Sequence, residues 1–223
     1  VLNRIDQCKK LVVAKMEGMA LGGGLEYALS ADVIVATPKV RIGFPETGIG
    51  IYPGLGGTQR TSRYIGKELA KYLIFTGRML SAQEAHAIGL IDYVFTPEKI
   101  EDMIQKKIAA KKLTPKKGKK TNALPSEWRQ IKELFNDANM DAWLSGHYLS
   151  SNDELAAKIA KNISGKAPLA LKMTNDIVDQ GFEMPLEKGL KQELKHLKEI
   201  FNTQDALTGL TSVGKGRPAF VGK

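Results

Sequence analysis

Cysteine, aromatic residues and long apolar runs are scarce in this 223-residue sequence. The single cysteine, Cys8, can form no disulfide within the chain, which fits a reducing compartment and predicts a cytoplasmic location, although a basic mitochondrial or bacterial enzyme would look the same. No apolar run approaches the roughly 20 residues that span a bilayer, so we expect no membrane partner. With 43% hydrophobic and 26% charged residues, the composition predicts a soluble globular protein.

The signatures of nucleotide and metal sites are also absent. Residues 48–57 contain five glycines, but no Gly-Lys-Ser/Thr follows them, which excludes a phosphate-binding P-loop. Nothing in the sequence has the pattern of a dinucleotide-binding fingerprint, so any NAD site would lie outside this chain. His86 has no acid or cysteine at metal-ligand spacing. We therefore expect no cofactor and no metal in this chain.

The sequence starts at Val1 without a methionine or a signal segment, which predicts that it starts inside a longer polypeptide. Its formal charge of +9 predicts an anionic partner, such as the phosphates of coenzyme A or a nucleic acid. Lysines gather between residues 106 and 120, and we interpret this stretch as a solvated helix end and loop. A phosphate-binding patch for coenzyme A or RNA is the alternative, but aromatic residues for base stacking are absent between the lysines, so nucleic acid is not the expected partner.

Residues 11–30 place three glycines between a predicted strand and a predicted helix. Residues 11–14 form a continuous apolar run, typical of a strand buried on both faces, and residues 25–30 have a helix-compatible composition. The first N–H groups of a helix lack intrahelical partners, and glycine lets an anionic oxygen approach them. Gly22, Gly23 and Gly24 thus indicate an oxyanion hole. The alternative is a tight turn that only lets helix and strand pack closely.

Two glutamates follow this turn, Glu26 in the first turn of the helix and Glu46 after a short return strand at residues 40–43. Their separation, 46 − 26 = 20 residues, is enough for a helix and a returning strand to bring both carboxyl groups to one side. A lone glutamate in a first helical turn is usually a surface residue. Two carboxyl groups in an apolar cleft repel each other when both are charged, so the pKa of one of them should rise. The pair then offers a protonated carboxyl as an acid and a carboxylate as a base.

The remaining sequence predicts further helices. Ser81 and Glu84 form a capping box, which gives Glu84 a structural role. Helices are expected at residues 58–64, 67–76, 125–136 and 153–163, from Pro168 onward, and as one long helix over 185–201. Trp128 and its neighbours at helical spacing are more typical of a core than of a binding site.

The segments around the two glutamates resemble the enoyl-CoA hydratase (crotonase) family. The resemblance rests on KLVVA at 10–14, ALGGGLE at 20–26, ADVIVA at 31–36, PE at 45–46, PGLGGTQR at 53–60, TGR at 76–78, SAQEA at 81–85, GLID at 89–92, TQDA at 203–206 and Gly209. It implies an α/β fold, a crotonase-like spiral of ββα units, incomplete at the N-terminus and followed by an α-helical C-terminal region. Residues from about 110 to 150 have no counterpart in stand-alone members. The predicted divisions are residues 1–105, the C-terminal part of the ββα core; 106–150, a Lys-rich and helical insertion; and 151–223, an α-helical oligomerisation region.

The resemblance implies an enoyl-CoA hydratase, which adds water syn to a trans-2-enoyl-CoA and gives a 3-hydroxyacyl-CoA in fatty-acid β-oxidation. The Gly23 amide would bind the thioester oxygen, together with a donor from a family segment that precedes Val1. Glu26 would deprotonate the water, Glu46 would protonate C2, and the Gly54 amide would hold the water. Family members that isomerise double bonds commonly keep only one of the two acids, so the pair favours hydration.

The resemblance also implies an acyl-CoA thioester as the substrate, with coenzyme A present only as part of it, and a homo-oligomer, a trimer or a hexamer. Three alternatives stay open. The extra segment at 110–150 suggests the hydratase part of a bifunctional 3-hydroxyacyl-CoA dehydrogenase, with NAD bound upstream. An enoyl-CoA isomerase is the second alternative. Because the other oxyanion donor is absent, the third is an inactive fragment that serves as an assembly or RNA-binding module.

Overall fold

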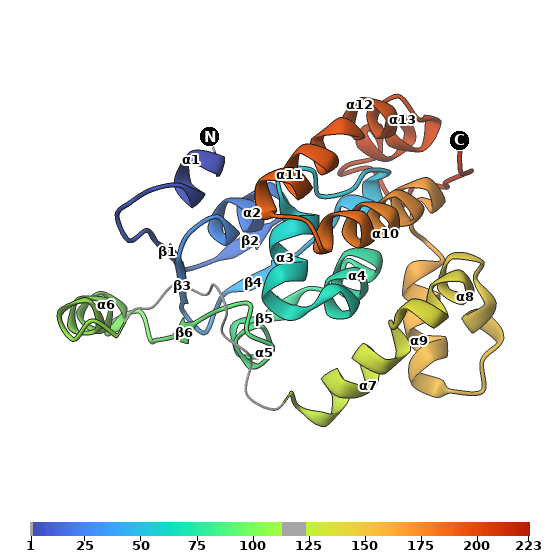
Figure 1. The fold of residues 1–223 in the computed structure, drawn as a ribbon. Helices are drawn as coiled ribbons and strands as arrows, with labels where there is room; N and C mark the ends of the chain where they lie inside the picture. Colours follow the sequence, from blue (N-terminus) through green and yellow to red (C-terminus); the bar gives the residue numbers. More distant parts are fainter. Residues whose placement is uncertain (1, 113–123) are drawn as a thin grey trace.

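The computed structural model describes residues 2–112 and 124–223 (Figure 1). The strands in these residues are β1 Val13–Met16, β2 Met19–Leu21, β3 Val33–Ala36, β4 Arg41–Gly43, β5 Leu80–Ser81 and β6 Tyr93–Val94. The helices before the gap are α1 Leu2–Asp6, α2 Gly23–Leu29, α3 Gly57–Ile65, α4 Lys67–Thr76, α5 Ala82–Ala87 and α6 Ile100–Ala109, with a 3-10 turn η1 at Glu46–Ile49. The helices after it are α7 Ser126–Leu134, α8 Met140–Leu144, α9 Glu154–Ile163, α10 Pro168–Phe182, α11 Leu186–Lys195, α12 Leu197–Phe201 and α13 Gln204–Thr211, with 3-10 turns η2 Asp137–Asn139 and η3 His147–Ser150.

The strands form two small sheets built from a repeated unit. In one sheet β3 lies between β1 and β6, all parallel; in the other, β4 pairs in parallel with β2 and antiparallel with β5. The chain twice runs through two strands to a helix, first β1, β2 and α2, then β3, β4 and α3. Equivalent strands of the two units pair, Val13 opposite Val33 and Met19 opposite Arg41. This arrangement confirms the predicted spiral of ββα units followed by C-terminal helices.

The predicted burial of the first strand on both faces is wrong. β1 begins at Val13, two residues later than expected, and lies at the edge of its sheet in the part of the chain that the structure describes. Its residues are half-buried, apart from exposed Lys15 and buried Met16, and Leu11 before it is exposed. β3, which has a neighbour on each side, is buried throughout. An apolar run shows that a strand can be buried, whereas its neighbours decide whether it is.

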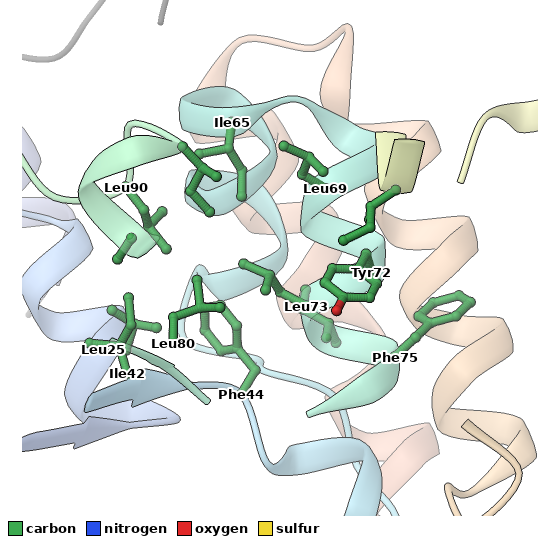
Figure 2. Packing of buried hydrophobic residues seen from close by; sticks show 14 of the residues in the cluster. Leu25, Ile42, Phe44, Ile65, Leu69, Tyr72, Leu73, Phe75, Leu80 and Leu90 are labelled. Carbon is green, nitrogen blue, oxygen red and sulfur yellow. The ribbon is translucent and has the colours of Figure 1, made fainter. Parts of the chain in front are cut away.

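The core gathers around α4 and fixes the elements that carry the two glutamates. Figure 2 shows Leu25 of α2, Ile42 of β4, Ile65 of α3, Leu73 of α4 and Leu80 of β5 packed in one cluster, and all five are buried. Burying one such side chain stabilises a fold by about 1.5–3 kcal/mol. Helix α2 and strand β4 are therefore held against one another, and with them the positions of Glu26 and Glu46.

Residues 124–150 add α7, α8 and two 3-10 turns to this same core. The rings of Trp128 and Phe135 meet the ring of Tyr72 on α4 edge to face, with centroids 6.0 and 5.4 Å apart. Trp128, Ile131 and Phe135 are buried, and Leu134 packs half-buried against the same core, which confirms the place in the core predicted for these four residues. The lysine cluster at residues 116–120 lies outside the described residues, and the division of the chain at residues 105 and 150 stays a prediction.

The C-terminal helices cover α3 and α4, with α10 against both and α11 across α10 and α3 (Figure 1). The predicted single helix over 185–201 is wrong, because α11 ends at Lys195 and α12 begins at Leu197. The Glu193 carbonyl accepts the hydroxyl of Tyr52 at 2.7 Å, and the His196 amide reaches that carbonyl only at 3.4 Å. A side chain from the first half of the chain thus interrupts the helix.

Across residues 2–112 and 124–223, no helix is long and apolar enough to cross a membrane, and no three His, Cys, Asp or Glu side chains are grouped so that they could hold a metal ion. The ring nitrogen Nδ1 of His86 lies 3.0 Å from the Ile91 carbonyl oxygen, and Nδ1 of His196 lies 3.2 Å from Glu199. Each of these two rings thus has a partner within five residues along the chain.

Candidate active site

The three glycines lie where β2 becomes α2, and the first of them makes room for Glu46. Gly22 has a φ of +50°, a conformation that favours glycine, and its N–H donates to the Gly43 carbonyl at 2.9 Å. A Cβ atom at position 22 would overlap Oε1 of Glu46. Gly23 is the exposed first residue of α2, and a Cβ atom there would lie 3.5 Å from Leu55. The turn thus combines an open helix terminus with a close approach to a carboxyl group.

Glu26 lies in the first turn of α2 and is 2% exposed. Its Oε1 accepts the N–H groups of Leu55 and Gly57, each at 2.7 Å. Burial raises the pKa of the Glu26 carboxyl, while the two N–H donors and the nearby Arg60 guanidinium oppose that rise. The donors hold the carboxylate in one place and stabilise its charged form.

Glu46 is the first residue of η1, directly after Pro45, and is 7% exposed. Its Oε2 is buried without a hydrogen-bond partner among the described residues. Burial, together with the charge of Glu26, raises the pKa of the Glu46 carboxyl to about 7. Near neutral pH this carboxyl can therefore hold a proton and can also give it away.

The structure brings Glu26 and Glu46 into one site, close enough for the charge of one to raise the pKa of the other. Both pKa values are raised by burial, but Glu26 has two backbone donors that favour its charged form, whereas Oε2 of Glu46 has none among the described residues. Glu26 is therefore the better-stabilised anion and Glu46 the better proton donor. An acid and a base of this kind can together move one proton off a water molecule and another onto a carbon atom.

Gly54 lies in the loop that donates to Glu26, buried between Tyr52 and Leu197. A Cβ atom at this position would overlap the Leu197 side chain of α12. The structure thus places Gly54 beside Glu26, one residue before the first amide that the carboxylate accepts. The role of its amide toward water stays a prediction.

A third buried glutamate, Glu193 on α11, was not predicted from the sequence. It is 0% exposed, and it accepts the N–H of Gly56 at 2.5 Å, the N–H of Thr58 at 3.2 Å and the hydroxyl of Thr58. Burial raises the pKa of the Glu193 carboxyl to about 8, with the charge of Glu26 adding to the rise. A signal was present in the sequence, since Glu193 stands three residues after Leu190, on the buried side of an amphipathic helix.

Arg60 supports the same loop from α3. Its side chain is buried, forms an ion pair with Asp6 of α1 and donates from Nη1 to the Leu55 carbonyl at 2.9 Å. Gly56 has a φ of +103°, and a Cβ atom there would overlap the Arg60 guanidinium. A hollow of about 200 Å³ lies next to this loop. Its lining residues are Leu2, Asn3, Gly54, Leu55, Gly56, Leu190, Glu193 and Leu194.

Comparison with known proteins finds similar sequences over most of this chain. Residues 1–216 match the family described as enoyl-CoA hydratase/isomerase. A short-chain-enoyl-CoA hydratase of Clostridium acetobutylicum is 32% identical, and the match covers 95% of this chain and 61% of that protein. A crotonyl-CoA hydratase of Syntrophomonas wolfei is 42% identical, over 100% of this chain and 66% of that protein. The chain thus spans less than two thirds of the length of the first relatives it matches.

The fold is shared with solved structures of similar enzymes. The crystal structure of a carnitinyl-CoA dehydratase from Mycobacterium thermoresistibile matches with a TM-score of 0.77 at 26% identity, over 98% of this chain and 65% of that one. An enoyl-CoA hydratase structure from Rhodobacter sphaeroides has the same TM-score of 0.77 at 23% identity and supports the fold alone.

Proposed function

The chain belongs to the enoyl-CoA hydratase/isomerase family, and from this premise we propose that it carries the site of an enoyl-CoA hydratase, which adds water syn to a trans-2-enoyl-CoA thioester. One observation carries the proposal: a carboxylate held by two amides, Glu26, lies beside a buried carboxyl with a pKa near 7, Glu46. Hydration needs a base for the water and an acid for C2, and this pair provides both.

The proposed steps start at the water. Both backbone donors bind Oε1 of Glu26, so Oε2 is left to face the water. Glu26 takes a proton from the water, and the water oxygen bonds to C3. The Gly54 amide holds the water during attack. Electrons move from the double bond toward the thioester oxygen, and Glu46 gives its proton to C2. The product is the 3-hydroxyacyl-CoA, and proton exchange with solvent restores the two carboxyl groups.

The Gly23 amide is proposed to donate to the thioester oxygen as negative charge builds on it. The exposure of Gly23 at the start of α2 supports this role, because the first amides of a helix have no intrahelical partner. A donor of this kind stabilises the transition state more than the ground state, and its loss typically costs about 3 to 4 kcal/mol.

Two acids at one site support hydration rather than isomerisation, since isomerising members commonly keep one of them. The names of the relatives from Clostridium and Syntrophomonas support crotonyl-CoA as the first substrate to assay. We further propose a role in fatty-acid β-oxidation, no cofactor beyond the coenzyme A of the substrate, and a homo-oligomer. A fused dehydrogenase and a cytoplasmic location stay predictions.

Product analysis in D₂O tests the reaction class. Crotonyl-CoA should give 3-hydroxybutyryl-CoA with one deuterium at C2, on the same face as the new hydroxyl group, because Glu46 delivers an exchangeable proton to C2 as water reaches C3. Mass spectrometry and proton NMR would measure both features. Deuterated but unhydrated product would show an isomerase instead, and unchanged substrate would oppose both activities.

A further inference from the structure

Glu26 and Glu193 bind the same loop through alternate amides. The N–H groups of Leu55 and Gly57 go to Oε1 of Glu26, both at 2.7 Å. The N–H of Gly56, between them, goes to Oε1 of Glu193 at 2.5 Å. Successive peptide groups thus point to opposite sides of the loop, one side toward α2 and the other toward α11.

The next residue, Thr58, binds Glu193 twice. Its N–H donates to Oε2 at 3.2 Å, and its hydroxyl donates to the same oxygen. Both oxygens of Glu193 are therefore occupied by this loop, and its side chain is 0% exposed. Glu193 lines the hollow beside the loop, but both of its carboxyl oxygens accept hydrogen bonds from the loop.

Helix α11 is itself tied to the loop by further contacts. The Tyr52 hydroxyl donates to the Glu193 carbonyl at 2.7 Å, and Leu197 packs against Gly54. Arg60 holds the Leu55 carbonyl at 2.9 Å. The loop is thus fixed at its start, its middle and its end, and the direction of the amides at positions 55 and 57 depends on what binds positions 56 and 58.

We propose that Glu193 is a positioning residue for Glu26: by accepting the amides of Gly56 and Thr58, it aims the two neighbouring amides at the Glu26 carboxylate and holds that carboxylate in place for the attacking water. The contacts alone support the orientation of the two amides, whereas the effect on the attacking water rests on the proposed hydratase function. The charged groups that face Glu193 are Glu26 of α2 and Arg60 and Arg63 of α3.

Glu193→Gln tests the proposal, because a carboxyl group has a lone pair on each oxygen even when it is protonated, whereas a carboxamide has one acceptor oxygen and must turn its NH₂ group toward either Gly56 or Thr58. In an activity assay on crotonyl-CoA, kcat should fall about 10- to 100-fold through the misplaced base, while KM stays within about twofold. In a double-mutant cycle, Glu193→Gln should have less than about a twofold effect on kcat in the Glu26→Gln background. Additive losses in that cycle would overturn the inference.

Asp205 provides a matched control. It is also a fully buried acid of the C-terminal helices, and it accepts two backbone amides, those of Val221 and Gly222 at 2.7 and 2.9 Å. Asp205→Asn should lower the melting temperature and leave kcat within about twofold of the wild type, because its partners lie outside the loop. An equal loss of kcat in both variants would show that Glu193 acts only through general stability.

A second readout does not depend on activity. The amide NMR signals of Leu55 and Gly57, followed across a pH series, should report the titration of Glu26. In Glu193→Gln these two signals should shift and exchange faster with solvent, whereas in Asp205→Asn they should match the wild type. Unchanged signals in Glu193→Gln would overturn the proposal.

The two proposals can fail separately. If the wild type converts no enoyl-CoA, the proposed function fails, while these signals still decide the role of Glu193. If Glu193→Gln does not fold, the same test is made with Thr58→Val, which removes one donor to Glu193.

Discussion

At the level of single residues, Glu46 has a buried carboxyl oxygen whose missing hydrogen bond destabilises the fold. A buried polar atom without a partner typically costs about 1–3 kcal/mol, and Oε2 of Glu46 is such an atom among the described residues. Burial raises the pKa of this carboxyl to about 7, so the folded state favours its protonated form. The same feature that weakens the fold supplies the proton donor of the proposed reaction.

This cost predicts a pH-dependent stability difference between the wild type and Glu46→Gln. Because the pKa of Glu46 is raised from 4.5 to about 7 on folding, its contribution to stability is full below about pH 4.5 and is lost as the pH rises through 7. The side chain introduced by Glu46→Gln does not titrate. The free energy of unfolding of this variant, taken relative to that of the wild type, should therefore rise by up to about 3 kcal/mol between pH 5 and pH 8.5. Urea unfolding at both pH values measures it.

Glu84→Gln is the control for that experiment. The pKa of the Glu84 carboxyl is lowered, since the Ser81 N–H and the Arg78 guanidinium outweigh its partial burial. A carboxyl with a lowered pKa keeps its full contribution above its ordinary value, so the gap between Glu84→Gln and the wild type should stay constant from pH 5 to pH 8.5. A constant gap for Glu46→Gln as well would contradict the raised pKa.

The residues of the site differ in how far the sequence could predict them. Glu26, Glu46 and the glycines lie in local motifs, so a short stretch of sequence is enough to identify them as candidate site residues. Glu193 binds an amide 137 positions away, and in the sequence it is one charged residue among many on α11. Its role depends on how α11 packs onto the loop, which no local pattern contains.

At the scale of elements, the turn from β2 to α2 decides where the carboxyl of Glu46 can lie. Gly22→Ala adds a Cβ that overlaps Glu46 Oε1 at a φ of +50°, whereas Gly24→Ala meets nothing within 4 Å. We expect Gly22→Ala to lower both the stability, by at least about 1 kcal/mol, and the turnover of crotonyl-CoA. Gly24→Ala should change neither by more than a small amount. Equal behaviour of the two variants in thermal unfolding and kinetic assays would refute this account of the turn.

Elements with local signals were the ones that the sequence predicted well. The capping box at Ser81 is present as expected, with the Ser81 hydroxyl accepting the Glu84 N–H and the Glu84 carboxylate accepting the Ser81 N–H. The burial of β1 and the continuity of the helix over 185–201 were predicted wrongly. Both depend on parts of the chain outside the segment itself. The burial of β1 depends on its neighbours in the sheet, and α11 ends where the Glu193 carbonyl accepts the Tyr52 hydroxyl.

At the scale of the whole molecule, the C-terminal helices both complete the site and expose apolar surface. Glu193 and Leu197 reach inward to the loop that binds Glu26. On the outside, large apolar side chains of α12, α13 and the residues after them are exposed. They are Phe201, Leu207, Leu210 and Val213. Exposed apolar groups of this kind often mark a protein contact, which supports the proposed homo-oligomer.

Leu207→Glu should therefore weaken self-association. Leu207 is 59% exposed, so the charge would be harmless in a monomer but costly in an apolar interface. Leu149→Glu is the control, because Leu149 is similarly exposed, at 54%, but lies on η3, which packs against α8 and α9. Sedimentation equilibrium should show a smaller mass for Leu207→Glu than for the wild type and for Leu149→Glu. A wild-type protein that sediments as a monomer would contradict the oligomer.

The role of Glu46 as the acid of a hydratase is tested directly by the loss of the enoyl-thioester absorbance of crotonyl-CoA across a pH series. The assay uses the chain expressed with whatever its gene encodes on either side, with Glu46→Gln alongside. Wild-type kcat/KM should fall as the pH rises through about 7, because Glu46 must be protonated to act, and the kcat/KM of Glu46→Gln should be lower by about 100-fold or more. Hydration by Glu46→Gln at the wild-type rate would contradict the account.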